Sequence, residues 1–205
     1  MSVDRAQAHE GLGVTAVGQY TDQAHWHADL LVRKYDQEMT RYATAKAHGS
    51  KPDDDIFAGL GIKPYEEVFT DGNLVTTAGW GRITTLLNAG TGNLITSTTA
   101  RVGAGNGSTA AAIGDTDLSA SAGSSNRYFM TCTVSVPSSP VLQFVAAFGS
   151  SDGNFAWSEW GIDIGTATVS AGTTVNAVLL NRKVASNGTK ASGQTWTATA
   201  TITFS

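Results

Sequence analysis

The spacing of apolar residues divides the chain into a helix-like part and a strand-like part. In the first part, apolar side chains recur at steps of three and four, as expected for one face of an amphipathic helix. These are Ala24, Ala28, Leu31, Tyr35, Met39 and Tyr42. The spacing predicts a helix over about residues 22–48, begun by Thr21 or Asp22 and ended by Gly49.

Two further helices are expected before the pattern changes. Pro52 and the three aspartates that follow favour a short helical turn, because acidic side chains stabilise the N-terminal end of a helix dipole. Over about residues 76–89, Trp80, Ile83 and Leu87 share one helical face, and Gly90 ends the run.

From about residue 94 the period becomes two, which is typical of strands with one buried face. We expect strands in residues 128–136, 141–148, 155–164, 173–184 and 195–204, with a turn at Asn187-Gly188. Five or six strands at this spacing favour an antiparallel sandwich.

The predicted fold class is therefore mainly β: an antiparallel β-sandwich or jelly-roll-like domain preceded by an α-helical N-terminal arm. Residues 1–72 are assigned to the arm, which contains the helix over about 22–48. Residues 73–205 are assigned to the β-sandwich domain, with a leading helix over about 76–89.

Composition narrows the classes of function. The net charge of -4 argues against binding nucleic acid through its phosphates. One cysteine excludes a disulfide framework, and no apolar run reaches the roughly 18 residues of a membrane span. Because the N-terminus is polar, we expect a soluble protein made in a reducing compartment, with no nucleic-acid or membrane partner.

Candidate catalytic residues are few. All four histidines lie in the first 48 residues, so a Ser/His/Asp triad in the β part has no local base. Cys132 sits at an inward strand position, which favours a core role over a nucleophilic one. Glu159 and Asp163 share a strand face with Trp157, as in a glycosidase cleft, but their Cα atoms would be about 13 Å apart. A polar outer face explains them more simply.

No metal or cofactor site is expected. On a helix, His25 and His27 would point about 200° apart and would not bind one ion together. Residues 103–108 are glycine-rich but lack the lysine of a phosphate-binding loop, which favours a flexible loop. Asp115 and Asp117 supply too few carboxylates for a calcium loop, so turn and capping roles are expected.

Three segments together resemble structural proteins of tailed bacteriophages, particularly those that infect actinobacteria. They are residues 73–87, residues 100–118, and a third group formed by 157–162, 179–184, Lys190 and the strand of Trp196. The resemblance covers about residues 73–205 and implies a capsid decoration protein, a minor capsid protein, or a tail or fibre component. It brings no catalytic residue to this chain.

The resemblance implies a non-enzymatic virion protein, made in the host cytoplasm, that binds the major capsid protein or tail proteins. A homotrimer would suit a local threefold axis of a capsid. Because the predicted helix of residues 22–48 would not bury its apolar stripe alone, we expect a contact surface on the arm. It comprises Trp26, Leu30, Leu31, Tyr35, Met39 and Tyr42.

Two other functions remain open from the sequence. A minor tail, baseplate or fibre component would engage tail proteins or a host glycan, with Trp157, Glu159 and Trp160 as a sugar-facing patch. A carbohydrate hydrolase would instead need Glu159 and Asp163 as its catalytic pair.

Overall fold

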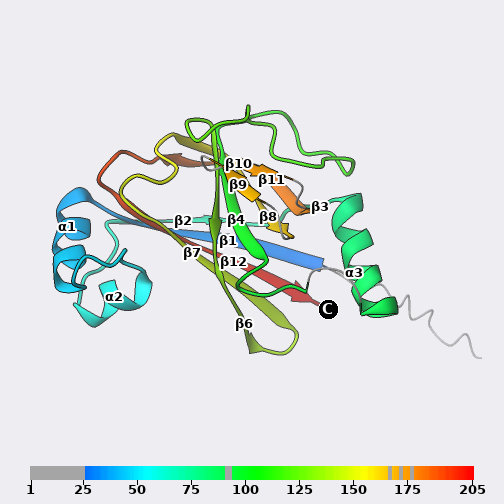
Figure 1. Ribbon diagram of the computed structural model, residues 1–205, viewed down its shortest axis with the longest axis horizontal. Helices are drawn as coiled ribbons and strands as arrows, with labels where there is room; N and C mark the ends of the chain where they lie inside the picture. Colours follow the sequence, from blue (N-terminus) through cyan, green and yellow to red (C-terminus); the bar gives the residue numbers. More distant parts are fainter. Residues whose placement is uncertain (1–25, 91–93, 166–167, 171–172, 176–177) are drawn as a thin grey trace, which may run out of the picture.

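The structure is a computed structural model that describes residues 26–90, 94–165, 168–170, 173–175 and 178–205. It is mainly β, with two five-stranded antiparallel sheets that pack around a common core (Figure 1). A small two-stranded hairpin is formed by β9 (Thr168–Ser170) and β10 (Thr173–Val175).

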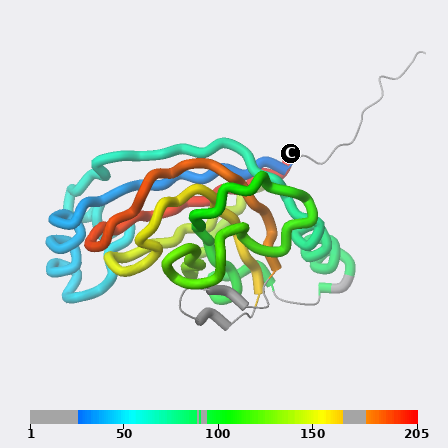
Figure 2. Tube along the Cα trace, turned by 90° about the horizontal axis from the view of Figure 1, so that it is seen from above, coloured from blue at the N-terminus to red at the C-terminus, as the bar shows by residue number. Residues whose placement is uncertain are grey.

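The first sheet, called sheet A, has the strand order β2-β1-β12-β7-β6. Its strands are β1 (Trp26–Tyr35), β2 (Glu66–Thr70), β6 (Thr133–Ser138), β7 (Val141–Phe148) and β12 (Thr195–Phe204). β1 pairs with β12 along its whole length, from Trp26 opposite Phe204 to Tyr35 opposite Thr195. Figure 2 shows β2 along one edge of the molecule beside β1.

The second sheet, called sheet B, has the order β3-β11-β8-β4-β5. Its strands are β3 (Leu74–Val75), β4 (Ala100–Gly105), β5 (Arg127–Thr131), β8 (Ala156–Ile164) and β11 (Val178–Thr189). The predicted single strand over 128–136 is divided at Cys132: β5 belongs to sheet B and β6 to sheet A. The chain crosses from one sheet to the other at this residue.

The core lies between the sheets and explains their alternating sequences. Ala28, Leu30 and Val32 of β1 are buried, while the residues between them face outward. β12 contributes Trp196, Ala198, Ala200 and Ile202, and β8 contributes Trp160, Ile162 and Ile164. The predicted strands over 141–148, 155–164 and 195–204 are confirmed as β7, β8 and β12.

The predicted helix over residues 22–48 is wrong for most of its length. Residues 26–35 form β1, and only α1 (Gln37–Lys46) is helical; residues 22–25 lie outside the described residues. The apolar residues of this segment fit both a helical spacing and the alternating spacing of a strand. Pairing with β12 along the whole segment favours the strand. Residues 26–72 thus supply two strands of sheet A, and in the described part of the chain no helical arm stands apart from the sheets.

The two other helices are confirmed. α2 (Asp54–Gly59) begins after Asp53, whose side chain accepts a hydrogen bond from the Ile56 amide. α3 (Thr77–Ala89) is capped by Thr76 and ends at Gly90, which has a positive φ of 58°. Figure 1 shows α1 and α2 at one end of the molecule and α3 at the other, near the C-terminus.

Two loop predictions are corrected. Residues 103–105 belong to β4, between β5 and β8, rather than to a flexible loop. Asn187 and Gly188 lie within β11 at a β-bulge, where Asn187 accepts a hydrogen bond from the Thr70 hydroxyl and is buried. In the described part of the chain, no helix is both long and apolar enough to cross a membrane.

Candidate functional site

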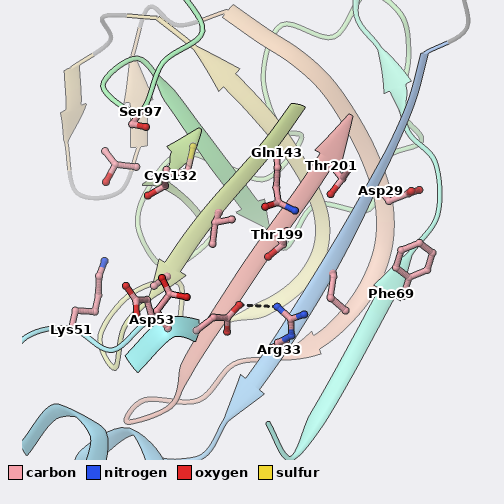
Figure 3. Close-up of a pocket in the computed structure, with 17 residues that line it drawn as sticks. Asp29, Arg33, Lys51, Asp53, Phe69, Ser97, Cys132, Gln143, Thr199 and Thr201 are labelled. Atoms are coloured by element: carbon pink, nitrogen blue, oxygen red, sulfur yellow. Dashed lines mark hydrogen bonds and ion pairs between the residues drawn. The ribbon is translucent and has the colours of Figure 1, made fainter. Parts of the chain in front are cut away.

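The outer face of sheet A carries a groove with a volume of about 970 Å³ (Figure 3). Its floor consists of outward-facing side chains of β1, β12 and β7, and Phe69 of β2 stands at one side. The floor residues are Asp29, Leu31, Arg33, Gln143, Val145, Ala147, Thr199 and Thr201. The surface is therefore mixed, with hydroxyl, amide and aliphatic groups between charged ends.

One end of the groove is held by ion pairs around the start of α2. Arg33 Nη1 lies 2.8 Å from Asp54 Oδ2, and its Nε lies 2.9 Å from Glu67 Oε1. Asp54 also accepts hydrogen bonds from the Tyr35 and Thr197 hydroxyls. These contacts fix α2 against β1 and β12, so this end of the groove is built from three separate parts of the chain.

At the other end of β1, three exposed or half-buried groups converge. His27 Nε2 lies 2.8 Å from Asp29 Oδ1 and 3.1 Å from Asp71 Oδ1. His27 and Asp29 are two residues apart on a strand and so share its outer face. Asp71 directly follows β2, whose Thr70 pairs with Leu30. The backbone amide of Gly72 donates a hydrogen bond to Asp29.

Sequence reasoning missed this cluster because it placed His27 on a helix. The helical spacing separates His27 from Asp29, whereas the strand period of two places them side by side. The signal was present in the alternation of Ala28, Leu30 and Val32 with polar neighbours. Asp71 comes from a distant part of the sequence, and only the pairing of β2 with β1 shows that it belongs to the cluster.

The carboxylates considered as a hydrolase pair are buried inside the protein, which corrects the expectation of a polar outer face. Glu159 is fully buried, accepts backbone hydrogen bonds from Ser119 and Ala120, and lies 2.7 Å from Arg182 Nε. Asp163 is buried 3.2 Å from Arg101 Nε. Both groups hold structural ion pairs and neither lines the groove.

Arg182 extends this ion-pair network to the segment between β4 and β5. Its Nη1 lies 2.6 Å from Asp115 Oδ2, and its Nη2 donates to the Thr109 carbonyl. Gly107 must lack a side chain, because a Cβ there would lie 2.1 Å from Ser119 Oγ. Of the turn and capping roles expected for Asp115, the turn role is confirmed, because its side chain accepts a hydrogen bond from the Ala112 amide and its own amide donates to the Ala112 carbonyl.

Two other reactive side chains are also buried. Burial raises the pKa of the Cys132 thiol to about 12, which confirms the predicted core role. Burial lowers the pKa of Lys190 to about 8, and its Nζ donates to the Gly149 carbonyl and to Asn154. Both groups serve packing and local order in the described structure.

The sugar-facing patch proposed from the sequence is also wrong. Trp157, Glu159 and Trp160 are buried, and the Trp157 indole donates a hydrogen bond to the Gly153 carbonyl. Their side chains are not available to a glycan. Phe69, which is 63% exposed beside the groove, was not singled out by the sequence pattern.

The six residues expected to form one contact surface are distributed over the molecule. Leu30 and Tyr35 are buried, and Leu31 lies on the floor of the groove. Met39 is half-buried and Tyr42 is exposed on α1, while Trp26 lies at the far end of β1. They do not form the continuous stripe that the helical prediction required.

A different apolar surface surrounds α3. Trp80 on this helix makes an edge-to-face contact with Trp26, and Trp26 makes another with Phe204. Trp80, Phe204 and Leu74 are each more than a third exposed, and Leu87, two turns along the helix from Trp80, is 83% exposed. We call Leu74, Trp80, Leu87 and Phe204, together with Trp26, the α3 surface.

Comparison of the chain with protein-family models, curated proteins and solved structures gives no match.

Proposed function

We propose that this protein is a non-enzymatic structural component of a tailed-phage virion, most simply a capsid decoration or minor capsid protein. The observation that carries the proposal is the α3 surface, which exposes aromatic and aliphatic side chains on an ordered element. Exposed apolar side chains gathered in one place are typical of protein-binding surfaces. The partner in this proposal is the major capsid protein, with the chain bound as a homotrimer in the virion.

The segments that resemble phage structural proteins support the proposal through their location. Residues 73–87 form β3 and most of α3, residues 100–105 form β4, and residues 157–162 and 179–184 lie in β8 and β11. They therefore make up most of sheet B together with the helix that lies on β11. In this proposal the jelly-roll-like sandwich is the body, and α3 presents the surface that meets the shell.

The mechanism would be cementing of the shell. Burial of apolar area stabilises a contact by about 25 cal/mol per Å². A protein that binds only the assembled shell raises the free energy needed to separate its subunits. The α3 surface suits this role because Trp80 and Phe204 are already held in place by Trp26.

The test combines copy number with a surface variant. We expect quantitative mass spectrometry of purified virions to find this protein in a ratio comparable to the major shell protein. Leu87→Asp should reduce incorporation at least tenfold without changing the thermal midpoint, because Leu87 is exposed. Val136→Asp is the matched control, since Val136 is also exposed but lies on β6. Equal incorporation of both variants, or absence from virions, would contradict the proposal.

A second candidate is a minor tail, baseplate or fibre component that binds a host glycan, and the groove on sheet A favours it. Gln143, Thr199 and Thr201 offer polar groups to sugar hydroxyls, and the exposed ring of Phe69 stands beside them. This candidate predicts a handful of copies per virion and glycan binding that is lost in Gln143→Ala. Leu87→Asp would leave that binding unchanged.

A further inference from the structure

We propose that His27, Asp29 and Asp71 bind a divalent transition-metal ion, with Zn²⁺ as the probe of choice. The site is independent of the proposed virion function. It joins two residues of β1 to one residue after β2, and the three ligand atoms lie within 4.8 Å of one another.

The first argument is the balance of charge and hydrogen-bond donors. Two carboxylate oxygens lie 2.8 and 3.1 Å from the same imidazole nitrogen, His27 Nε2. Carboxylates only accept hydrogen bonds, and a neutral imidazole has one nitrogen that accepts. At these distances an Nε2–H donates to both carboxylates in the metal-free protein, and a metal ion would take the place of that proton between the three ligand atoms.

The second argument is the type of ligand. An imidazole nitrogen with two carboxylate oxygens suits Zn²⁺, Mn²⁺, Co²⁺ or Fe²⁺ better than Mg²⁺ or Ca²⁺, which prefer oxygen ligands alone. Three protein ligands leave at least one position on the metal for water or another ligand. Asp29 also lines the groove, so a bound metal would lie at the rim of the groove.

The third argument is the support behind the ligands. The Gly72 amide donates to Asp29 Oδ1 at 3.2 Å, which orients that carboxylate in the way that outer hydrogen bonds orient metal ligands. The pairing of β1 with β2 fixes the position of Asp71 relative to Asp29.

The experiment is isothermal titration of the whole chain with Zn²⁺, repeated with His27→Ala, Asp71→Asn and the control His48→Ala. His48 is exposed and follows α1 at the opposite end of β1. We expect one saturable site per chain, an affinity at least about tenfold weaker in His27→Ala and Asp71→Asn, and no change in His48→Ala. Zn²⁺ should also raise the thermal midpoint of the wild-type chain and of His48→Ala, but not of the two ligand variants.

Two results would overturn the proposal. One is the absence of saturable binding in the wild-type chain. The other is binding that persists unchanged in both ligand variants, which would place the ion elsewhere. His27 and Asp71 are both exposed, so their substitution is expected to leave the fold intact, and the metal-free thermal midpoints check this.

Discussion

At the scale of single residues, the most consequential groups are charged side chains that the fold has taken out of water. Glu159 and Arg182 are both buried and lie 2.7 Å apart, and Glu159 also accepts two backbone hydrogen bonds. A buried charge that loses its partner is costly, whereas loss of both charges is often tolerated. The pair therefore specifies how the segment between β4 and β5 lies against β8 and β11.

We expect Glu159→Gln to lower the free energy of unfolding by about 3 kcal/mol, because it leaves the buried Arg182 guanidinium with Asp115 as its remaining carboxylate partner. Urea denaturation measures this loss. The double variant Glu159→Gln with Arg182→Met should lose less than the single variant, since it removes the buried cation and leaves only the partly exposed Asp115 carboxylate without its partner. A single variant as stable as the wild type would show that the ion pair is dispensable.

Lys190 gives stability a distinctive dependence on pH. Because burial lowers the pKa of Lys190 from 10.5 to about 8, the folded protein releases this proton at a lower pH than the unfolded chain does. Between these two values the unfolded state binds more protons, so the contribution of Lys190 to stability rises with pH. From pH 7 to pH 9 the rise should be about 1 kcal/mol, measured as the difference between wild type and Lys190→Met in urea.

The Cys132 thiol has the opposite pH dependence, but it is present in both proteins and so cancels from their difference. Burial raises the pKa of Cys132 from 9 to about 12, so this thiol stays protonated in the folded state after the unfolded chain has ionised. Its contribution to stability therefore falls as pH rises above 9, opposite to that of Lys190. A wild-type advantage over Lys190→Met that is constant from pH 7 to pH 9 would contradict the assigned role of Lys190.

At the scale of elements, α3 shows how closely a helix can approach a strand. A Cβ on Gly79 would lie 2.2 Å from the Leu180 carbonyl oxygen of β11, whereas a Cβ on Gly81 would meet nothing within 4 Å. The Thr76 amide donates to the same carbonyl at 3.1 Å, which holds the start of the helix against the strand. Gly79 thus permits α3 to contact β11, whereas Gly81 only lowers the helix propensity of α3.

The two glycines provide a matched pair of variants. Gly79→Ala should destabilise the protein by about 1–3 kcal/mol, because α3 must move away from β11. Gly81→Ala should stabilise it by up to about 1 kcal/mol through helix propensity alone. Thermal unfolding of both variants checks the signs, and equal effects would show that α3 does not rest on β11 through Gly79.

The sequence allowed the strands β7, β8 and β12 and the helices α2 and α3 to be predicted, because each has one dominant period and clear end signals. β1 was missed because its residues satisfy a helical period and an alternating one at the same time. Long-range pairing with β12 decides between them, and a local pattern contains no information about that pairing.

The candidate sites were harder to predict than the elements. The groove depends on the outer faces of non-consecutive strands, and the cluster of His27, Asp29 and Asp71 depends on β2 lying beside β1. The burial of Glu159 could not be seen in an alternating strand, because both faces of β8 are covered. An alternating sequence shows which face of a strand is buried when the other face is exposed. It does not show that both faces of a strand are buried.

At the scale of the whole molecule, the two sheets depend on residues from both ends of the chain. β1 lies between β2 and β12, and its Ala28, Leu30 and Val32 fill the core opposite sheet B. Residues 26–72 also provide the cluster in which Tyr35 stacks on Phe57 with ring centroids 3.6 Å apart. A division of the chain near residue 72 would therefore cut through one sheet and its core.

We expect a chain of residues 73–205 to lack a cooperative unfolding transition. Without β1, the strand β12 loses all ten of its paired residues on one side and becomes an exposed edge, and the core side chains Trp196, Ala198 and Ala200 are uncovered. Exposing several buried apolar side chains costs a few kcal/mol for each of them. The sum exceeds the total stability of a typical domain, which is about 5–15 kcal/mol. Urea denaturation of the shortened chain, with the full chain as control, measures this. A cooperative transition with an unchanged midpoint would instead show that residues 73–205 fold alone, and that residues 26–72 are an addition to a complete domain.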